Sequence, residues 1–120
     1  MGTNVKRYTV LAAKALITLA FVAAGLAKLA GVDMMVATFD AIGFGQWFRY
    51  VTGSIEIGAA LLLWLPGRQF IGAGLLLVTM IGAVLAHFVI LGTDTMLPAI
   101  VLGLLAAFVA YTHRDQASTA

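Results

Sequence analysis

Four ionisable side chains, Lys28, Arg49, Glu56 and His87, lie inside or at the ends of long apolar stretches. A charged group placed in hydrocarbon is costly, and ionisable residues within membrane segments generally mark a binding site or a proton pathway. A carboxylate beside a histidine can also pass protons near neutral pH, because imidazole changes its charge there. These residue types therefore predict a polar pocket that binds a ligand, relays protons, or does both.

Glu56 belongs to a stretch whose spacing suits a helix. Arg49, Thr52 and Glu56 are separated by three and four residues, so a helix places all three on one face. The carboxylate can accept hydrogen bonds from Lys28, Arg49 or His87, and opposite charges in one pocket offset much of the cost of burying them. The partner of this carboxylate stays open among these three residues.

The composition indicates a membrane protein. Hydrophobic residues make up 62% of the chain and charged residues only 10%, and so few charges cannot cover the surface of a soluble domain of this length. Several apolar runs instead predict an all-α, multi-pass membrane protein with a single domain over residues 1–120. We expect its membrane helices at about 8–29, 47–65, 70–91 and 96–111.

Three smaller features complete the predicted organisation. Apolar residues at helical spacing, with Asp33 and Asp40 between them, predict an amphipathic helix at about 32–42 that lies on the membrane surface and covers the outer end of the bundle. Gly72, Gly74 and Gly82 are small residues that favour close contacts between membrane helices. Residues from about 114 to 120 are polar, and we expect them to form a disordered tail.

The distribution of charge predicts the orientation. Basic residues flank one side of the predicted membrane helices, at Lys6, Arg7, Arg68 and Arg114. Acidic residues occupy the loops of the other side, at Asp33, Asp40 and Asp94. Because basic residues favour the cytoplasmic side, both termini are predicted to be cytoplasmic. The loops are short, so the four helices are predicted to form an up-down-up-down bundle.

This orientation places the ionisable residues by depth. At 1.5 Å per residue, Glu56 lies about 13 Å and His87 about 6 Å from the outer surface, and Lys28 lies near the outer end of the first helix. The outer half therefore gathers the polar cluster. In the inner half we expect Lys14 to extend to the cytoplasmic head groups, and His113 to be solvated after the last helix.

Several classes of function are excluded by what the sequence lacks. A net charge of +2 is too small to suggest a nucleic-acid partner, and the absence of cysteine excludes disulfide and thiolate chemistry on this chain. The sequence contains no haem-ligation pattern, phosphate loop, serine–histidine–aspartate set or metal-ligand cluster. We therefore expect no intrinsic cofactor and no self-sufficient catalytic motif.

Several motifs together resemble the DoxX-like family. They are GLAK at 25–28, Arg49, GSIE at 53–56, PGR at 66–68, and Met80 with His87. The resemblance implies a small four-helix protein of the bacterial inner membrane and marks Lys28, Glu56 and His87 as polar positions typical of the family. It also implies a role beside quinone-linked sulfur oxidation or redox-defence complexes, and more distant relatives act as assembly chaperones for membrane proteins.

Two classes of function follow. In the first, Lys28, Arg49, Thr52, Glu56 and His87 form a pocket for a small lipophilic molecule, with a quinone as the leading candidate, and a partner subunit supplies the redox centre. In the second, the chain is a non-catalytic subunit or assembly factor, and the polar cluster only fixes how the helices pack. Its partner would then be a membrane protein, a periplasmic protein or a second copy of the chain.

The two classes differ in what Glu56→Gln is expected to do. A ligand site would lose its ligand while the bundle stays nearly as stable. A structural network would instead lose stability, because a buried cation would be left without its counterion.

Overall fold

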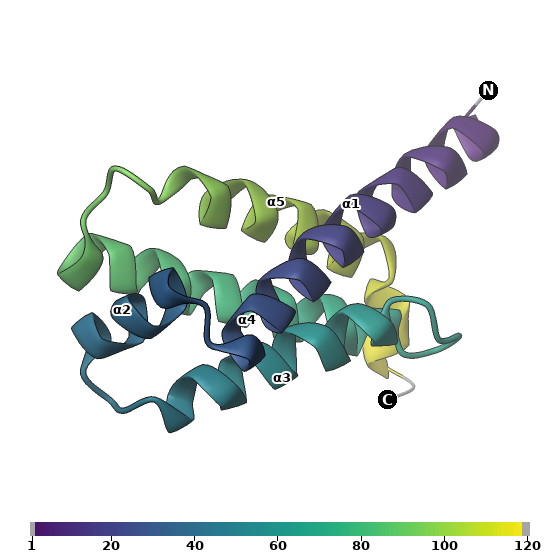
Figure 1. Cartoon of the computed structure of the whole chain (residues 1–120). Coiled ribbons are helices and arrows are strands. Elements are labelled where there is room, and N and C mark those ends of the chain that lie inside the picture. The colour runs from purple at the N-terminus through teal and green to yellow at the C-terminus, as the bar shows by residue number, and fades with distance from the viewer. Residues whose placement is uncertain (1, 119–120) are drawn as a thin grey trace.

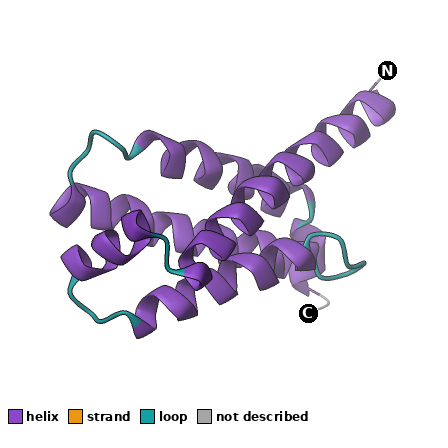
Figure 2. Ribbon diagram, viewed as in Figure 1, coloured by secondary structure: helices purple, strands orange, loops and turns teal. Residues whose placement is uncertain are grey.

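The computed structural model describes residues 2–118, and within them every regular element is helical. The five α-helices are α1 (Gly2–Ala30), α2 (Asp33–Ile42), α3 (Trp47–Leu62), α4 (Gln69–Ala86) and α5 (Leu97–Thr112). A π-helical turn (His87–Leu91) continues α4, and a 3-10 helix (Arg114–Ser118) follows α5. Figure 2 shows this all-helical chain, which confirms the predicted fold class at that level.

Four of the helices pack side by side and alternate in direction (Figure 1). Helix α3 lies between α1 and α4, α4 also packs against α5, and α5 touches α1. The start of α1, the 3-10 helix after α5 and the turn between α3 and α4 lie toward the same end of the molecule, which we call the terminal end, and α1 projects beyond the other helices there (Figure 1). The short helix α2 lies at the opposite end, the α2 end, where it contacts α1, α3 and the π-helical turn.

The helix bounds differ from the predicted ones in three places. Helix α1 begins at Gly2 rather than near residue 8, because no residue after Gly2 interrupts a helix. The segment predicted at 70–91 changes to π-helical geometry at His87, where the Gly92 N–H donates to the His87 carbonyl at 2.7 Å. The predicted disordered tail is wrong for Arg114–Ser118, which is helical, and residues 119–120 lie outside the described residues.

Two helical segments have the length and apolar character that a membrane span requires. These are Gly2–Ala30 and Gln69–Leu91, while Leu97–Thr112 is apolar but shorter. Helix α2 matches the amphipathic helix predicted at 32–42 and ends at Gly43, whose φ of 89° is readily adopted only by glycine.

The hydrophobic core occupies the half of the molecule nearer the terminal end. Its largest fully buried side chains are Phe21 and Ile17 of α1, Leu63 after α3, Leu76 of α4 and Val109 of α5. Alanines from the same helices fill the space between these side chains. This half is therefore a dry, closely packed core, as its apolar sequence indicates.

Close helix contacts depend on glycine at particular positions only. A Cβ atom at Gly72 would lie 2.6 Å from the Ala59 carbonyl oxygen of α3, so α3 and α4 meet there. At Gly74 and Gly82 no close helix contact forms among the described residues, since a Cβ there would meet no described atom within 4 Å. A contact of these two glycines with a partner or a second copy stays a prediction. The glycine contact that matters for the α2 end is between α1 and α3, where a Cβ at Gly25 would lie 2.8 Å from the Gly53 carbonyl oxygen.

Candidate ligand-binding cavity

A cavity of about 1000 Å³ lies between α3 and α4 on the side of the α2 end, beneath α2 and the π-helical turn. Most of its wall is apolar, including methionines of α2, Phe48 of α3 and several small residues of α4. Six polar side chains also line it: Lys28, Thr38, Thr52, Glu56, Thr79 and His87. Thr95, from the exposed loop before α5, adds a seventh at the rim.

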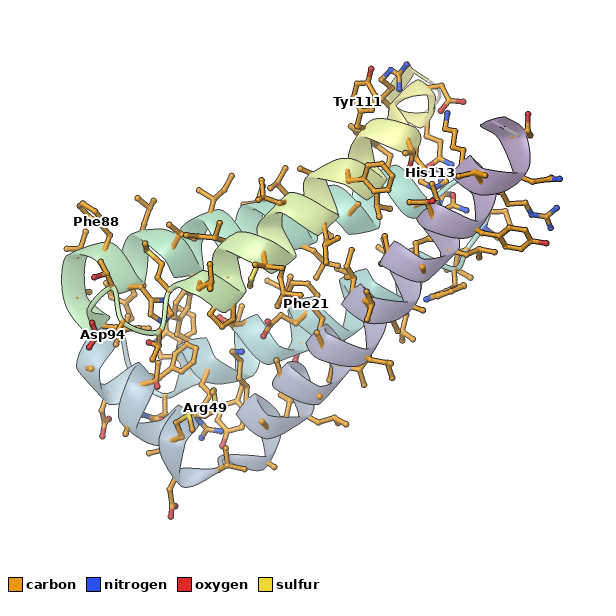
Figure 3. The ribbon with its side chains drawn as sticks, turned by 90° about the horizontal axis from the view of Figure 1, so that it is seen from above. Phe21, Arg49, Phe88, Asp94, Tyr111 and His113 are labelled. Carbon is orange, nitrogen blue, oxygen red and sulfur yellow. The ribbon has the colours of Figure 1, made fainter. Side chains whose placement is uncertain are left out.

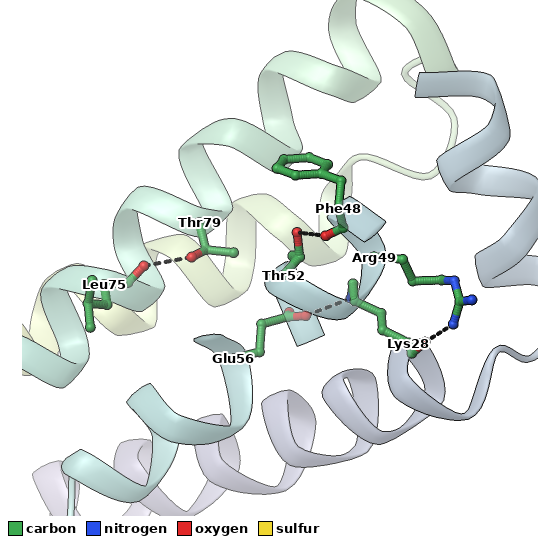
Figure 4. A network of polar contacts seen from close by, with 7 residues as sticks. All are labelled: Lys28, Phe48, Arg49, Thr52, Glu56, Leu75 and Thr79. Carbon is green, nitrogen blue, oxygen red and sulfur yellow. Dashed lines mark hydrogen bonds and ion pairs between the residues drawn. The ribbon is translucent and has the colours of Figure 1, made fainter. Parts of the chain in front are cut away.

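The centre of this site is a buried ion pair between α1 and α3. Lys28 Nζ lies 2.8 Å from Glu56 Oε1, and the two side chains are 13% and 2% exposed (Figure 4). Helices α1 and α3 approach closely because Gly25 meets Gly53, and Lys28 Cβ then lies beside Gly53. From there the long lysine side chain runs one turn along α3 to reach the carboxylate.

The ion pair identifies the partner of the Glu56 carboxylate, which the sequence left open among three residues. Within residues 2–118, Glu56 pairs with Lys28 and not with Arg49 or His87. The direct attraction between the two charges offsets the cost of removing each from water. Because both groups also border the cavity, the pair is positioned to meet a bound molecule.

Threonine and histidine side chains of three elements complete the polar part of the wall. Thr52 Oγ1 donates to the Phe48 carbonyl at 2.8 Å and Thr79 Oγ1 to the Leu75 carbonyl at 2.7 Å (Figure 4). His87 Nδ1 lies 2.8 Å from the Ala83 carbonyl oxygen.

Sequence reasoning missed Thr79. The signal was present, since Thr79, Ala83 and His87 follow one another at intervals of four on one helix face.

Arg49 is buried but does not line the cavity, so its predicted place among the ligand-binding residues is not supported by the geometry. Its Nε donates to Gln46 Oε1 at 2.7 Å, and its Nη1 donates to the Lys28 carbonyl. Gln46 Nε2 in turn donates to the Val36 carbonyl and to Asp40 Oδ1, both at 3.0 Å. Arg49 therefore joins the ends of α1 and α3 to α2, and it holds α2 in place over the cavity.

A second polar group lies at the terminal end. Lys14 is only 9% exposed: its Nζ lies 3.4 Å from the Leu63 carbonyl oxygen and 4.8 Å from the centre of the Trp64 ring. The expectation that Lys14 extends to the head groups is therefore wrong. The reason is that the last carbonyls of α3 have no partner within the helix, so they accept from a nearby cation.

His113 is likewise not the solvated residue that we expected. Its Nε2 atom is buried and has no hydrogen-bond partner among the described residues. Burial lowers the pKa of His113, the charge of Lys14 lowers it further, and Asp115 acts in the opposite direction. Figure 3 shows Arg49 and His113 at opposite ends of the molecule, with Phe21 of the core between them.

The 3-10 helix after His113 is fixed by one side chain. Gln116 Oε1 accepts from the Phe70 N–H at 2.9 Å, and Gln116 Nε2 donates to Gln69 Oε1 at 2.7 Å. The 3-10 helix therefore docks on the start of α4, which is why the polar composition of this segment did not lead to disorder. No metal site accompanies these groups, since the described part of the chain has no cluster of three or more metal-ligating side chains.

Comparison with known proteins gives one match. The sequence pattern of the DoxX-like family matches residues 12–109, which is most of the chain and includes every polar residue of the cavity wall. No curated protein and no solved structure gives a significant match.

Proposed function

Because the chain belongs to the DoxX-like family, which is membrane-associated, we propose that it is a multi-pass protein of the bacterial inner membrane whose cavity binds a small lipophilic molecule. The helices α1, α3, α4 and α5 would cross the bilayer as an up-down-up-down bundle, in which α3 and α5 are the shorter members with 16 residues each. The basic residues Lys6, Arg7, Arg68 and Arg114 all belong to the terminal end, which supports a cytoplasmic position for both termini. The cavity then lies in the outer half of the membrane.

The observation that carries this proposal is the Lys28–Glu56 pair at the wall of a large, otherwise apolar cavity. A packing device alone needs no empty volume beside it, whereas this pair borders a cavity of about 1000 Å³. Ligand sites are typically apolar cavities of roughly 300–1000 Å³ with a few polar groups that orient the ligand. The cavity fits that description.

The apolar rim indicates how a ligand would enter. Val51 and Ile55 of α3, Val78 of α4 and Val89 of the π-helical turn line the cavity and are also exposed on the outside of the bundle. In a bilayer these side chains face lipid, so a lipophilic molecule can pass between α3 and α4 without crossing water. Our leading candidate is a molecule of the quinone–hydroquinone class, with a redox centre supplied by a partner protein.

A second candidate function is supported by the position of the same ion pair. Lys28 and Glu56 join α1 to α3 directly beside the Gly25–Gly53 contact, so the pair also stabilises the helix packing. A non-catalytic subunit or assembly factor would need only that role. In that case the cavity would hold ordinary lipid, and the functional contacts would be with a protein partner or a second copy of the chain.

The test uses a variant that fills the cavity and keeps the ion pair. Gly82 lines the cavity and a Cβ there would meet no described atom within 4 Å, so a larger side chain has room to occupy the cavity. Gly74 is equally open among the described residues but does not line the cavity. We would purify wild type, Gly82→Phe and the matched control Gly74→Phe from native membranes, and identify co-purifying lipophiles by mass spectrometry. The proposal expects one small lipophile in wild type and Gly74→Phe, and at least a fivefold loss in Gly82→Phe, which is about 1 kcal/mol.

Equal content in all three samples would reject a ligand in this cavity. A single stoichiometric protein partner, retained by all three in the absence of a small lipophile, would instead favour the subunit or assembly role.

A further inference from the structure

Resting on the proposed lipophile site, we infer that the cavity selects molecules whose head group donates hydrogen bonds. Such head groups are the hydroxyls of a phenol or a hydroquinone, and the carbonyl of a quinone is the opposite type. The inference comes from the direction of every side-chain hydrogen bond in the polar part of the wall.

The three threonines of α2, α3 and α4 have their protons turned away from the cavity. Thr38, Thr52 and Thr79 each donate to the carbonyl four residues earlier, at 2.8, 2.8 and 2.7 Å. A carbonyl oxygen only accepts, so the hydroxyl proton must lie in that bond. Each threonine oxygen therefore offers the cavity lone pairs and no proton.

His87 repeats the same arrangement on the wall formed by the π-helical turn. Its Nδ1 lies 2.8 Å from the Ala83 carbonyl, so Nδ1 must carry the proton that makes this bond. In the neutral imidazole the other nitrogen, Nε2, is then an acceptor. A fourth side chain thus presents an acceptor to the cavity, for the same reason as the threonines.

The Lys28–Glu56 pair offers a ligand in the cavity more hydrogen-bond acceptors than hydrogen-bond donors. The Glu56 carboxylate has several lone-pair positions and accepts only from Lys28 among the described residues. The Lys28 ammonium directs one proton to Glu56 and keeps others for a ligand, and the Thr95 hydroxyl at the rim can also donate. Acceptors therefore outnumber donors around the deeper part of the cavity.

A hydroxyl head group fits this wall because it can donate to one of the acceptors while its oxygen accepts from Lys28. A quinone carbonyl can only accept. It would compete with Glu56 for Lys28 and would leave the threonine and histidine acceptors unpaired. We expect at least about a tenfold preference for the hydroxyl form, which corresponds to roughly 1.4 kcal/mol.

The experiment compares three probes with the same alkyl chain: para-decylphenol, its methyl ether, and decyl-benzoquinone. Full-length protein in lipid nanodiscs and empty nanodiscs of the same lipid are equilibrated with each probe, and bound probe is quantified by mass spectrometry. Only the excess over empty nanodiscs counts as binding. The methyl ether keeps the shape and apolar area of the phenol and removes its proton.

The outcomes separate this inference from the proposal on which it rests. A phenol excess about tenfold above both other probes supports the inference. Quinone binding equal to or stronger than phenol binding overturns the inference while the lipophile site stands. No excess of any probe overturns both.

A second comparison tests whether the threonines of the cavity wall cause the preference for phenol over quinone. The double variant Thr52→Val, Thr79→Val removes two acceptors, and we expect it to lower phenol binding several-fold while quinone binding stays within twofold. Thr9→Val is the matched control, because Thr9 makes the same bond to the carbonyl of Val5 at 2.7 Å but does not line the cavity. Retention of the full phenol preference in the double variant would overturn the inference even if wild type prefers phenol.

Discussion

Helix α1 carries two lysines with little exposed surface, and their settings are opposite: Lys14 is buried and Lys28 is partly buried. Lys28 has a carboxylate at 2.8 Å and a large cavity beside it, at the α2 end. Lys14 has a carbonyl at 3.4 Å and an indole ring, and it is not among the residues that line this cavity. A charged side chain with little exposed surface therefore points to ligand binding when a cavity lies beside it, as at Lys28. Low exposure by itself does not distinguish Lys28 from Lys14.

The difference in volume arises from the residues of α4 that face α3. Near the terminal end, Leu76 and its alanine neighbour Ala73 fill the interface completely. Toward the α2 end, Thr79, Ala83 and Ala86 are short and leave the space between the helices open. Helix α4 is therefore closely packed at one level and borders a cavity at another.

The largest expected effect is on the Lys28–Glu56 pair. Lys28→Met or Glu56→Gln alone should destabilise the protein by about 3–5 kcal/mol, since each leaves the other group buried without its counterion. The double variant should be less destabilised than either single variant. Unfolding in detergent, followed by circular dichroism, measures this, and a Glu56→Gln variant as stable as wild type would contradict it.

The expected loss changes how Glu56→Gln is interpreted. Near-wild-type stability was the sequence-based expectation for a ligand site, but a pair with both members buried contributes to stability in either role. Loss of ligand from this variant is therefore ambiguous by itself. The cavity-filling and threonine variants, which keep the pair, decide the question.

A smaller effect is expected at Arg49, which holds α2 over the cavity. Arg49→Met should cost about 1.5–3 kcal/mol, the usual range for hydrogen bonds made by a charged group. It should also speed amide hydrogen exchange in α2 while leaving α5 unchanged. Arg114→Met is the matched control, because Arg114 also bonds a carbonyl and stacks on a tyrosine but is exposed. Equal exchange in α2 for both variants would show that Arg49 does not hold this helix.

Lys14→Met should have a still smaller effect. The substitution removes a long hydrogen bond and a cation–π contact, and it leaves no anion unpaired, so we expect a loss of no more than about 1 kcal/mol. Ligand content should equal that of wild type. A loss as large as that of Lys28→Met would mean that the two lysines have equivalent roles, and would remove the distinction drawn here.

The smallest effect is a pH dependence at the terminal end. Burial lowers the pKa of His113 below its ordinary value of 6.5, so the unfolded chain takes up the proton at a higher pH than the folded protein does. Stability should therefore fall as the pH decreases below about 6.5, and should level off below the folded-state pKa. Melting temperatures of wild type and His113→Gln between about pH 8 and pH 5 test this. A wild type that loses no more stability than the variant would contradict it.

Much of the fold and part of the site could be predicted from the sequence. The apolar runs are long enough to require helices, so their number and approximate places follow from hydrophobicity. Helix α2 was predicted because apolar residues recur at helical intervals between Asp33 and Asp40. Thr52, Glu56 and His87 were placed at one end because depth along a helix follows from residue number at 1.5 Å per residue.

The sequence by itself therefore determined where the long helices lie and at what height along them each polar group sits, but not the 3-10 helix Arg114–Ser118. Only the tertiary structure decided which of them meet, because contact depends on how each helix is rotated about its axis. The Gly25–Gly53 contact turns α1 so that Lys28 reaches Glu56, and Arg49 is left to bond Gln46 and the end of α1. The cavity also depends on side chains of α2 and α3 on one side and of α4 with its π-helical turn on the other. These segments are distant in sequence, so no local pattern predicts that they enclose a common space.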